Sequence, residues 1–140
     1  MDNPISLSIL IPLIPFGMTF LIFILLTSFN KTMNRLTKPV SYLIILSILI
    51  SSLFSLFFFL NHIEGTILIS KYFSFLRDSG VQLHLNQLNE EIIIFMGLFA
   101  SSIIAYSLFK LPRKKGYVLY VVFIGLLTSL VEATLLIVDF

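Results

Sequence analysis

The chain has 140 residues, of which 58% are hydrophobic and 11% charged, with a net charge of +2 and no cysteine. Soluble domains are about a quarter charged, so this composition indicates a small membrane protein with a single domain, residues 1–140. The lack of cysteine excludes disulfides and thiolate chemistry, and two histidines alone cannot form a metal site, so we expect no metal and no other cofactor.

Four stretches are long and apolar enough to cross a bilayer, which requires about 20 apolar residues in a helix. They cover about residues 4–29, 39–61, 90–109 and 117–138. The predicted fold class is therefore all-α and integral to the membrane, with four transmembrane helices.

Residues near the start of three of these spans predict how the helices begin. Asn3 is a good capping residue for the first span and Pro4 suits the first helical position. Pro39 is expected at the first position of the second helix. Asn89 is expected to cap the third helix, and Glu90 lies in its first turn, where a carboxylate favours the positive end of the helix dipole.

The connection between the second and third spans is predicted to contain secondary structure of its own. Polar residues recur along one side of residues 66–78 and apolar residues along the other, which is typical of an amphipathic helix. That helix would lie on the membrane surface or pack on the bundle. Residues 81–86 alternate between apolar and polar, which predicts a strand of a short β-hairpin. His62 and His84 fall in this connection, and we interpret them as exposed polar residues.

The positive charges predict the orientation of the chain. They gather in the two short connections that follow the first and third spans, at Lys31, Arg35, Lys38, Lys110, Arg113, Lys114 and Lys115. Four spans place these connections on one side, which the positive-inside rule makes cytoplasmic, or stromal in a thylakoid. Both termini are then expected on the lumenal or periplasmic side. The first span lacks a basic segment before it, so we expect it to be retained rather than cleaved as a signal peptide.

Small residues recur at every fourth position in three of the spans. These stripes are Ser47, Ser51 and Ser55, then Gly97, Ser101 and Ala105, then Gly125, Ser129 and Ala133. Such stripes let helix backbones approach closely in lipid. We interpret them as contacts within the bundle, and the same stripes could also pack this chain against a larger membrane complex.

Glu132 is the one ionisable side chain deep within a predicted span. A carboxyl group at this depth is costly and is a candidate proton site, and the alternative is a structural, hydrogen-bonded glutamate. The spans contain no Lys, Arg, Asp or His that could complete a relay, so the chain alone is not expected to pump protons. No catalytic, nucleotide-binding or nucleic-acid-binding motif is present, so we expect no nucleic-acid partner.

Three segments resemble the start of a known family. They are LIPLIPF at residues 10–16, SFNKTMNRLTKP at residues 28–39 and NHIEG at residues 61–65. The similarity is to the antiporter-like membrane subunit, chain 5, of type I NAD(P)H–quinone oxidoreductases, above all its cyanobacterial and plastid form. The resemblance implies a truncated, divergent relative of the N-terminal four-helix part of that subunit, in a thylakoid or plasma membrane.

The sequence also departs from this family. Full-length members are several times longer, and Asn-Glu-Glu at residues 89–91 stands where they carry Asp-Pro-Leu. The chain ends before the helix that carries the family's pumping glutamate and before its Lys and His relay. Glu132 does not match that pumping glutamate, so no catalytic residue is carried over.

Three functions are compatible with these observations. The leading hypothesis is a diverged or accessory membrane subunit of a complex I-like or antiporter assembly linked to proton transport, without a relay or redox centre of its own. Its partners would be the lipid bilayer and other membrane subunits. The second is a small transporter or transport modulator that uses Glu132, and the third is a structural membrane protein.

Overall fold

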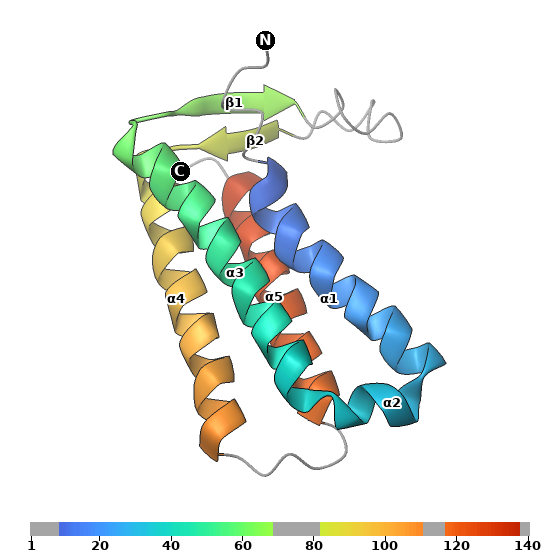
Figure 1. Ribbon diagram of the computed structural model, residues 1–140. Helices are drawn as coiled ribbons and strands as arrows, with labels where there is room; N and C mark the ends of the chain where they lie inside the picture. Colours follow the sequence, from blue (N-terminus) through green and yellow to red (C-terminus); the bar gives the residue numbers. More distant parts are fainter. Residues whose placement is uncertain (1–8, 69–81, 111–116, 138–140) are drawn as a thin grey trace.

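The computed structural model describes residues 9–68, 82–110 and 117–137 of the chain. The elements are α1 (Leu10–Ser28), α2 (Asn30–Arg35), α3 (Thr37–Leu60), β1 (Gly65–Leu68), β2 (Gln82–Leu85), α4 (Gln87–Lys110) and α5 (Tyr117–Ile137). The four long helices run side by side, and the two strands lie across one end of the bundle (Figure 1). We call this end the strand end.

The helices α1, α3, α4 and α5 are each long and apolar enough to cross a membrane. They contain 19 to 24 residues, and a rise of about 1.5 Å per residue gives each a length close to the thickness of a bilayer core. The chain is therefore an integral membrane protein. The predicted fold class is confirmed, including a short antiparallel pair of strands between the second and third spans.

The start of α3 differs from the prediction. The helix begins at Thr37, so Pro39 is its third residue rather than its first. Proline is tolerated there because the first N–H groups of a helix have no acceptor within it. The N–H of Val40 donates to the carbonyl of Leu36 at 3.1 Å and thereby begins the regular ladder.

The predicted cap of α4 was wrong by three residues. Asn86 is the capping residue, because its side-chain oxygen accepts a hydrogen bond from the N–H of Asn89 at 2.9 Å. Asn89 lies inside the first turn, and its side-chain nitrogen donates to the carbonyl of His84 at 2.9 Å. This contact ties the start of α4 to β2.

The amphipathic helix predicted from residue 66 is wrong for residues 66–68. These residues belong to β1, where Thr66 lies opposite His84 and Leu68 opposite Gln82. Pairing with β2 satisfies the backbone polar groups along one edge of each segment, which outweighs the helical pattern of the side chains. The rest of that predicted helix lies outside the described residues, as do the expected start of the first span at residue 4 and the end of the last at residue 138. The short helix α2 was not predicted.

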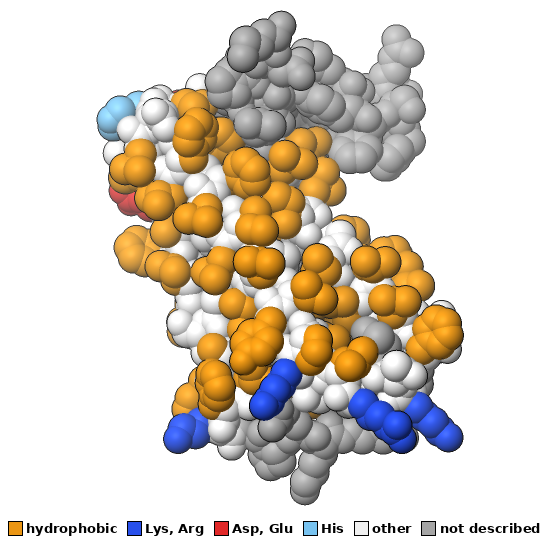
Figure 2. Space-filling view, in the orientation of Figure 1, with side chains coloured by type: hydrophobic (Ala, Val, Ile, Leu, Met, Phe, Trp, Pro, Cys, Tyr) orange, Lys and Arg blue, Asp and Glu red, His pale blue; other side chains and the backbone are white. Residues whose placement is uncertain are grey.

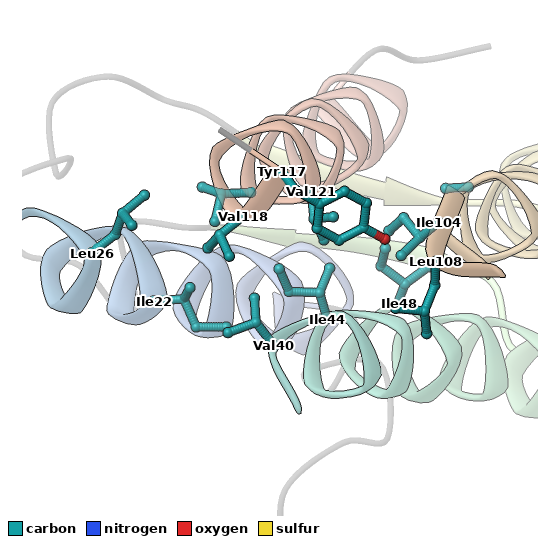
Figure 3. Close-up of a cluster of buried hydrophobic side chains, with 12 residues drawn as sticks. Ile22, Leu26, Val40, Ile44, Ile48, Ile104, Leu108, Tyr117, Val118 and Val121 are labelled. Carbon is teal, nitrogen blue, oxygen red and sulfur yellow. The ribbon is translucent and has the colours of Figure 1, made fainter. Parts of the chain in front are cut away.

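Two apolar clusters fill the bundle. The larger lies away from the strands and includes Tyr117, whose ring points toward Ile104 and Leu108 (Figure 3). Its members are Ile22, Leu26, Val40, Ile44, Ile48, Ala100, Ile104, Leu108, Tyr117, Val118, Val121 and Val122. The smaller cluster lies under the strands and consists of Ile11, Phe58, Leu83, Leu85, Ile93 and Leu136.

The outer surface is mostly apolar, as expected for a lipid-facing bundle, and Figure 2 shows Lys and Arg gathered at the end opposite the strands. We call this the basic end. The described basic residues there are Lys31, Arg35, Lys38 and Lys110, which are all exposed. The first turn of α1 and the last turn of α5 lie at the strand end (Figure 1).

Candidate functional site: a polar layer within the bundle

Small and polar side chains separate the two apolar clusters. On α3 they lie between Ile48 and Phe58, and on α5 between Val122 and Leu136. We call this set the polar layer. It consists of the buried residues Thr19, Ser51, Ser52, Ser55, Gly97, Gly125, Thr128, Ser129 and Glu132. Because all four long helices contribute, the layer crosses the whole bundle.

Glu132 is completely buried in this layer. Its two carboxyl oxygens lie 3.2 and 3.1 Å from the hydroxyl of Ser51, which donates to them from α3. Ser51 is completely buried as well. The sequence singled out Glu132 and Ser51 separately, and the fold brings them together across the contact between α5 and α3.

At Gly97, α4 packs tightly against α3. A Cβ atom at Gly97 would overlap the hydroxyl oxygen of Ser52 and lie 3.1 Å from its Cβ. The glycine therefore allows the two backbones to pack around Ser52, as expected for small residues between membrane helices. Sequence reasoning missed Ser52, because it lies one residue away from the stripe of serines on α3.

Gly125 serves the same purpose between α5 and α1. A Cβ atom there would overlap a methyl group of Thr19 and lie 3.2 Å from Ile44. The sequence did not single out Thr19, because α1 has no repeating stripe of small residues. Its hydroxyl donates to the carbonyl of Pro15 at 2.8 Å, so the side chain presents its methyl group to α5.

The other residues of the three stripes differ in burial. Ser47, Ser55, Ser101 and Ser129 are buried, whereas Ala105 and Ala133 are only half-buried. The last positions of the stripes on α4 and α5 are therefore packed less closely than the other positions.

Glu90 is a buried carboxyl group that sequence reasoning assigned only to the first turn of a helix. Its side chain is 1% exposed, and its backbone carbonyl accepts a hydrogen bond from the Ser55 hydroxyl at 2.8 Å. The spacing did contain a signal, because Glu90, Ile93 and Gly97 follow one another at helical intervals along the buried face of α4.

Several buried polar atoms have no hydrogen-bond partner within the described part of the chain. They are the side-chain oxygens Ser52 Oγ, Asn89 Oδ1, Glu90 Oε1 and Ser101 Oγ. A buried group of this kind is costly unless water or an ion satisfies it. The described residues contain no group of three His, Asp or Glu side chains able to hold a metal.

The fold and this site together define the class of the protein. It is an integral membrane protein with four spans and a buried carboxyl group between its helices. The chain is 30% identical over 131 residues, or 91% of its length, to NAD(P)H-quinone oxidoreductase subunit 5, organellar chromatophore 1, of Paulinella chromatophora. The aligned part covers 20% of that protein, so the chain spans about a fifth of the relative's length. This supports a distant relationship. No family model and no solved structure matches the chain.

Proposed function

We propose that the chain is a diverged or accessory membrane subunit of an NAD(P)H–quinone oxidoreductase-type or related antiporter complex. The similarity to subunit 5 carries this proposal, because it extends over 91% of the chain and therefore includes at least part of each of the four spans. In this role the protein packs against other membrane subunits and has no redox centre of its own. The oxidoreductase activity belongs to the complex.

The lipid-facing surface of α4 offers a contact area for such partners. Phe95, Phe99 and Phe109 are 71%, 69% and 73% exposed, which places large aromatic side chains on the outside of this helix. Aromatic residues are enriched where proteins contact one another, and the same side chains are compatible with lipid.

Co-purification tests the proposal. A tagged chain, solubilised in a mild detergent from its native membrane, should recover other subunits of the complex, identified by mass spectrometry. An unrelated four-span membrane protein with the same tag should recover none of them. A pure chain from the native membrane, with no other subunit of the complex, would contradict the proposal.

The orientation is part of the proposal. The basic end is placed on the cytoplasmic or stromal side, and both chain termini on the lumenal or periplasmic side of a thylakoid or plasma membrane. The exposed Lys31, Arg35, Lys38 and Lys110 at one end of the bundle support this arrangement under the positive-inside rule.

The hydrogen bond between Ser51 and Glu132 favours a second candidate function. A completely buried carboxyl group within a membrane bundle is a candidate proton site. In this role the chain acts as a transport modulator whose Glu132 binds and releases a proton. A structural membrane protein would instead use Glu132 only to join α5 to α3.

A further inference from the structure

We propose that the outer face of α3 and α4 binds one electroneutral diacyl lipid from the leaflet at the strand end. A furrow between α3 and α4 holds one acyl chain, and a second furrow on the other side of Leu53 holds the other chain. Glu91, at the mouth of the first furrow, disfavours an anionic headgroup. The inference is independent of membership of a complex and of the role of Glu132.

The first furrow lies between α3 and α4 and has a volume of about 270 Å³. Its lining residues are Leu49, Ser52, Leu53, Leu56, Ile94 and Leu98. All of these residues except Ser52 are apolar, and the hydroxyl oxygen of Ser52 is buried where α3 faces Gly97. The free surface of the furrow is therefore hydrocarbon, which suits an acyl chain and offers no hydrogen bond to a polar ligand.

A second furrow lies beside the first on α3 and has a volume of about 390 Å³. The described residues that line it are Ile50, Leu53, Phe54 and Phe57, so the two furrows share Leu53. The side chain of Leu53 is 61% exposed and stands between the furrows as a ridge. The two flexible chains of one lipid can lie on either side of such a ridge. A partner helix, which is about 10–12 Å wide with its side chains, would instead rest on the ridge.

Both furrows lie at the depth of one leaflet. Their α3 residues run from Leu49 to Phe57, and these two lie about 16 and 5 Å from the end of the helix at Leu60, at a rise of about 1.5 Å per residue. Half of a bilayer core is about 15 Å thick. An acyl chain of the strand-end leaflet therefore passes along the whole furrow, whereas a chain from the opposite leaflet reaches only its inner end.

The charges at the mouth of the first furrow determine the headgroup. On α4, Glu91 lies three residues before Ile94 and seven before Leu98, so it continues the wall of the furrow toward the strand end. Its side chain is half-buried, and Glu64 is exposed at the same end on the turn before β1. The described Lys and Arg residues gather at the basic end (Figure 2). Carboxylates at the mouth repel an anionic headgroup, so a lipid without net charge is favoured.

Native mass spectrometry of the full chain tests the site. The chain is released from nanodiscs that contain phosphatidylcholine and phosphatidylglycerol in equal amounts, and the lipid that each chain retains is identified by its mass. We expect one phosphatidylcholine per chain and at least threefold less phosphatidylglycerol. Glu91→Lys should reverse this preference, because it places a positive charge at the mouth of the furrow.

Tryptophan substitutions separate the furrow from the rest of the lipid-facing surface. Leu98→Trp fills the furrow and should reduce the retained lipid at least threefold, and Leu56→Trp on the α3 wall should do the same. Leu127→Trp is the matched control, because Leu127 is 60% exposed, against 50% for Leu98, and lines neither furrow. Both leucines lie near the middle of their helices, so they sit at similar depth.

The other possible occupants of this face give different results. The site is wrong if the chain retains no lipid, if it retains the two lipids equally, or if Leu98→Trp and Leu127→Trp lose lipid to the same extent. A dimer without bound lipid would show that a second copy covers the face. A photo-crosslinking residue at position 98 should bond to lipid in the native membrane, and a bond to a protein there would also overturn the proposal.

Discussion

Replacing Gly97 with alanine should destabilise the bundle by about 1–3 kcal/mol, the usual cost of overpacking a close contact. The added Cβ would overlap the Ser52 hydroxyl, and it lies 3.1 Å from the Cβ of the same residue. Rotation of the Ser52 side chain can relieve the overlap with its hydroxyl but not the 3.1 Å contact with its Cβ, so α4 must shift slightly away from α3, which weakens the packing of the polar layer. The free energy of unfolding in detergent micelles or the midpoint of thermal unfolding measures the effect.

Two further variants make this prediction specific. Ser52→Gly removes the two Ser52 atoms that the new Cβ would crowd and leaves only an ordinary contact with Ile48, so it should restore part of the stability in the Gly97→Ala background. Gly17→Ala is the matched control, because a Cβ at Gly17 would have no atom within 4 Å, and helix propensity should make this variant neutral or slightly more stable. Equal effects of alanine at Gly17 and Gly97 would show that α3 and α4 do not pack as described.

Replacing Glu132 with alanine should destabilise the protein by about 1–3 kcal/mol, the cost of leaving a buried polar group without its partner. The variant removes the acceptor of the Ser51 hydroxyl and opens a cavity where a completely buried side chain was. Glu132→Gln should have a smaller effect, because its amide oxygen still accepts from Ser51 and the volume is kept. Unfolding in detergent compares the two variants.

A double-mutant cycle isolates the hydrogen bond itself. Ser51→Ala combined with Glu132→Ala, each of which removes the hydrogen bond, should give a coupling energy between about 0.6 and 1.7 kcal/mol, the average and the largest value for hydrogen bonds between membrane helices. Thr134→Ala provides the control, because Thr134 is exposed on the same helix and its hydroxyl donates to the carbonyl of Leu130 in that helix. If the changes in the free energy of unfolding caused by the two substitutions simply add, no hydrogen bond joins α3 to α5 at Ser51 and Glu132.

Hydropathy predicted the four spans because each is a long apolar run with few charged residues. The ends of the helices were harder to predict, since they depend on local hydrogen bonds. Asn86 and Asn89 are both good capping residues, and the contact of the Asn89 side chain with His84 on β2 decides between them. Residues 66–68 carry a helical pattern of side chains, yet the pairing of β1 with β2 determines their conformation.

The polar layer was only partly visible in the sequence. Regular spacing identified Ser51, Gly97 and Gly125, and depth within a span identified Glu132. Neither property identifies Thr19 or Ser52, because these residues are buried by the neighbours that the fold brings to them. Which stripe faces which helix depends on the tertiary arrangement, and spacing along one helix does not specify it.

Cysteine labelling from each side of the membrane tests the arrangement of the four spans most directly, and the chain contains no cysteine that would need to be removed. Single cysteines at Lys31 and Lys110 should react with a membrane-impermeant thiol reagent from the cytoplasmic or stromal side. A cysteine at Glu64 should react only from the opposite side. All three residues are exposed. Labelling of Lys31→Cys and Lys110→Cys from opposite sides would contradict the four-span bundle.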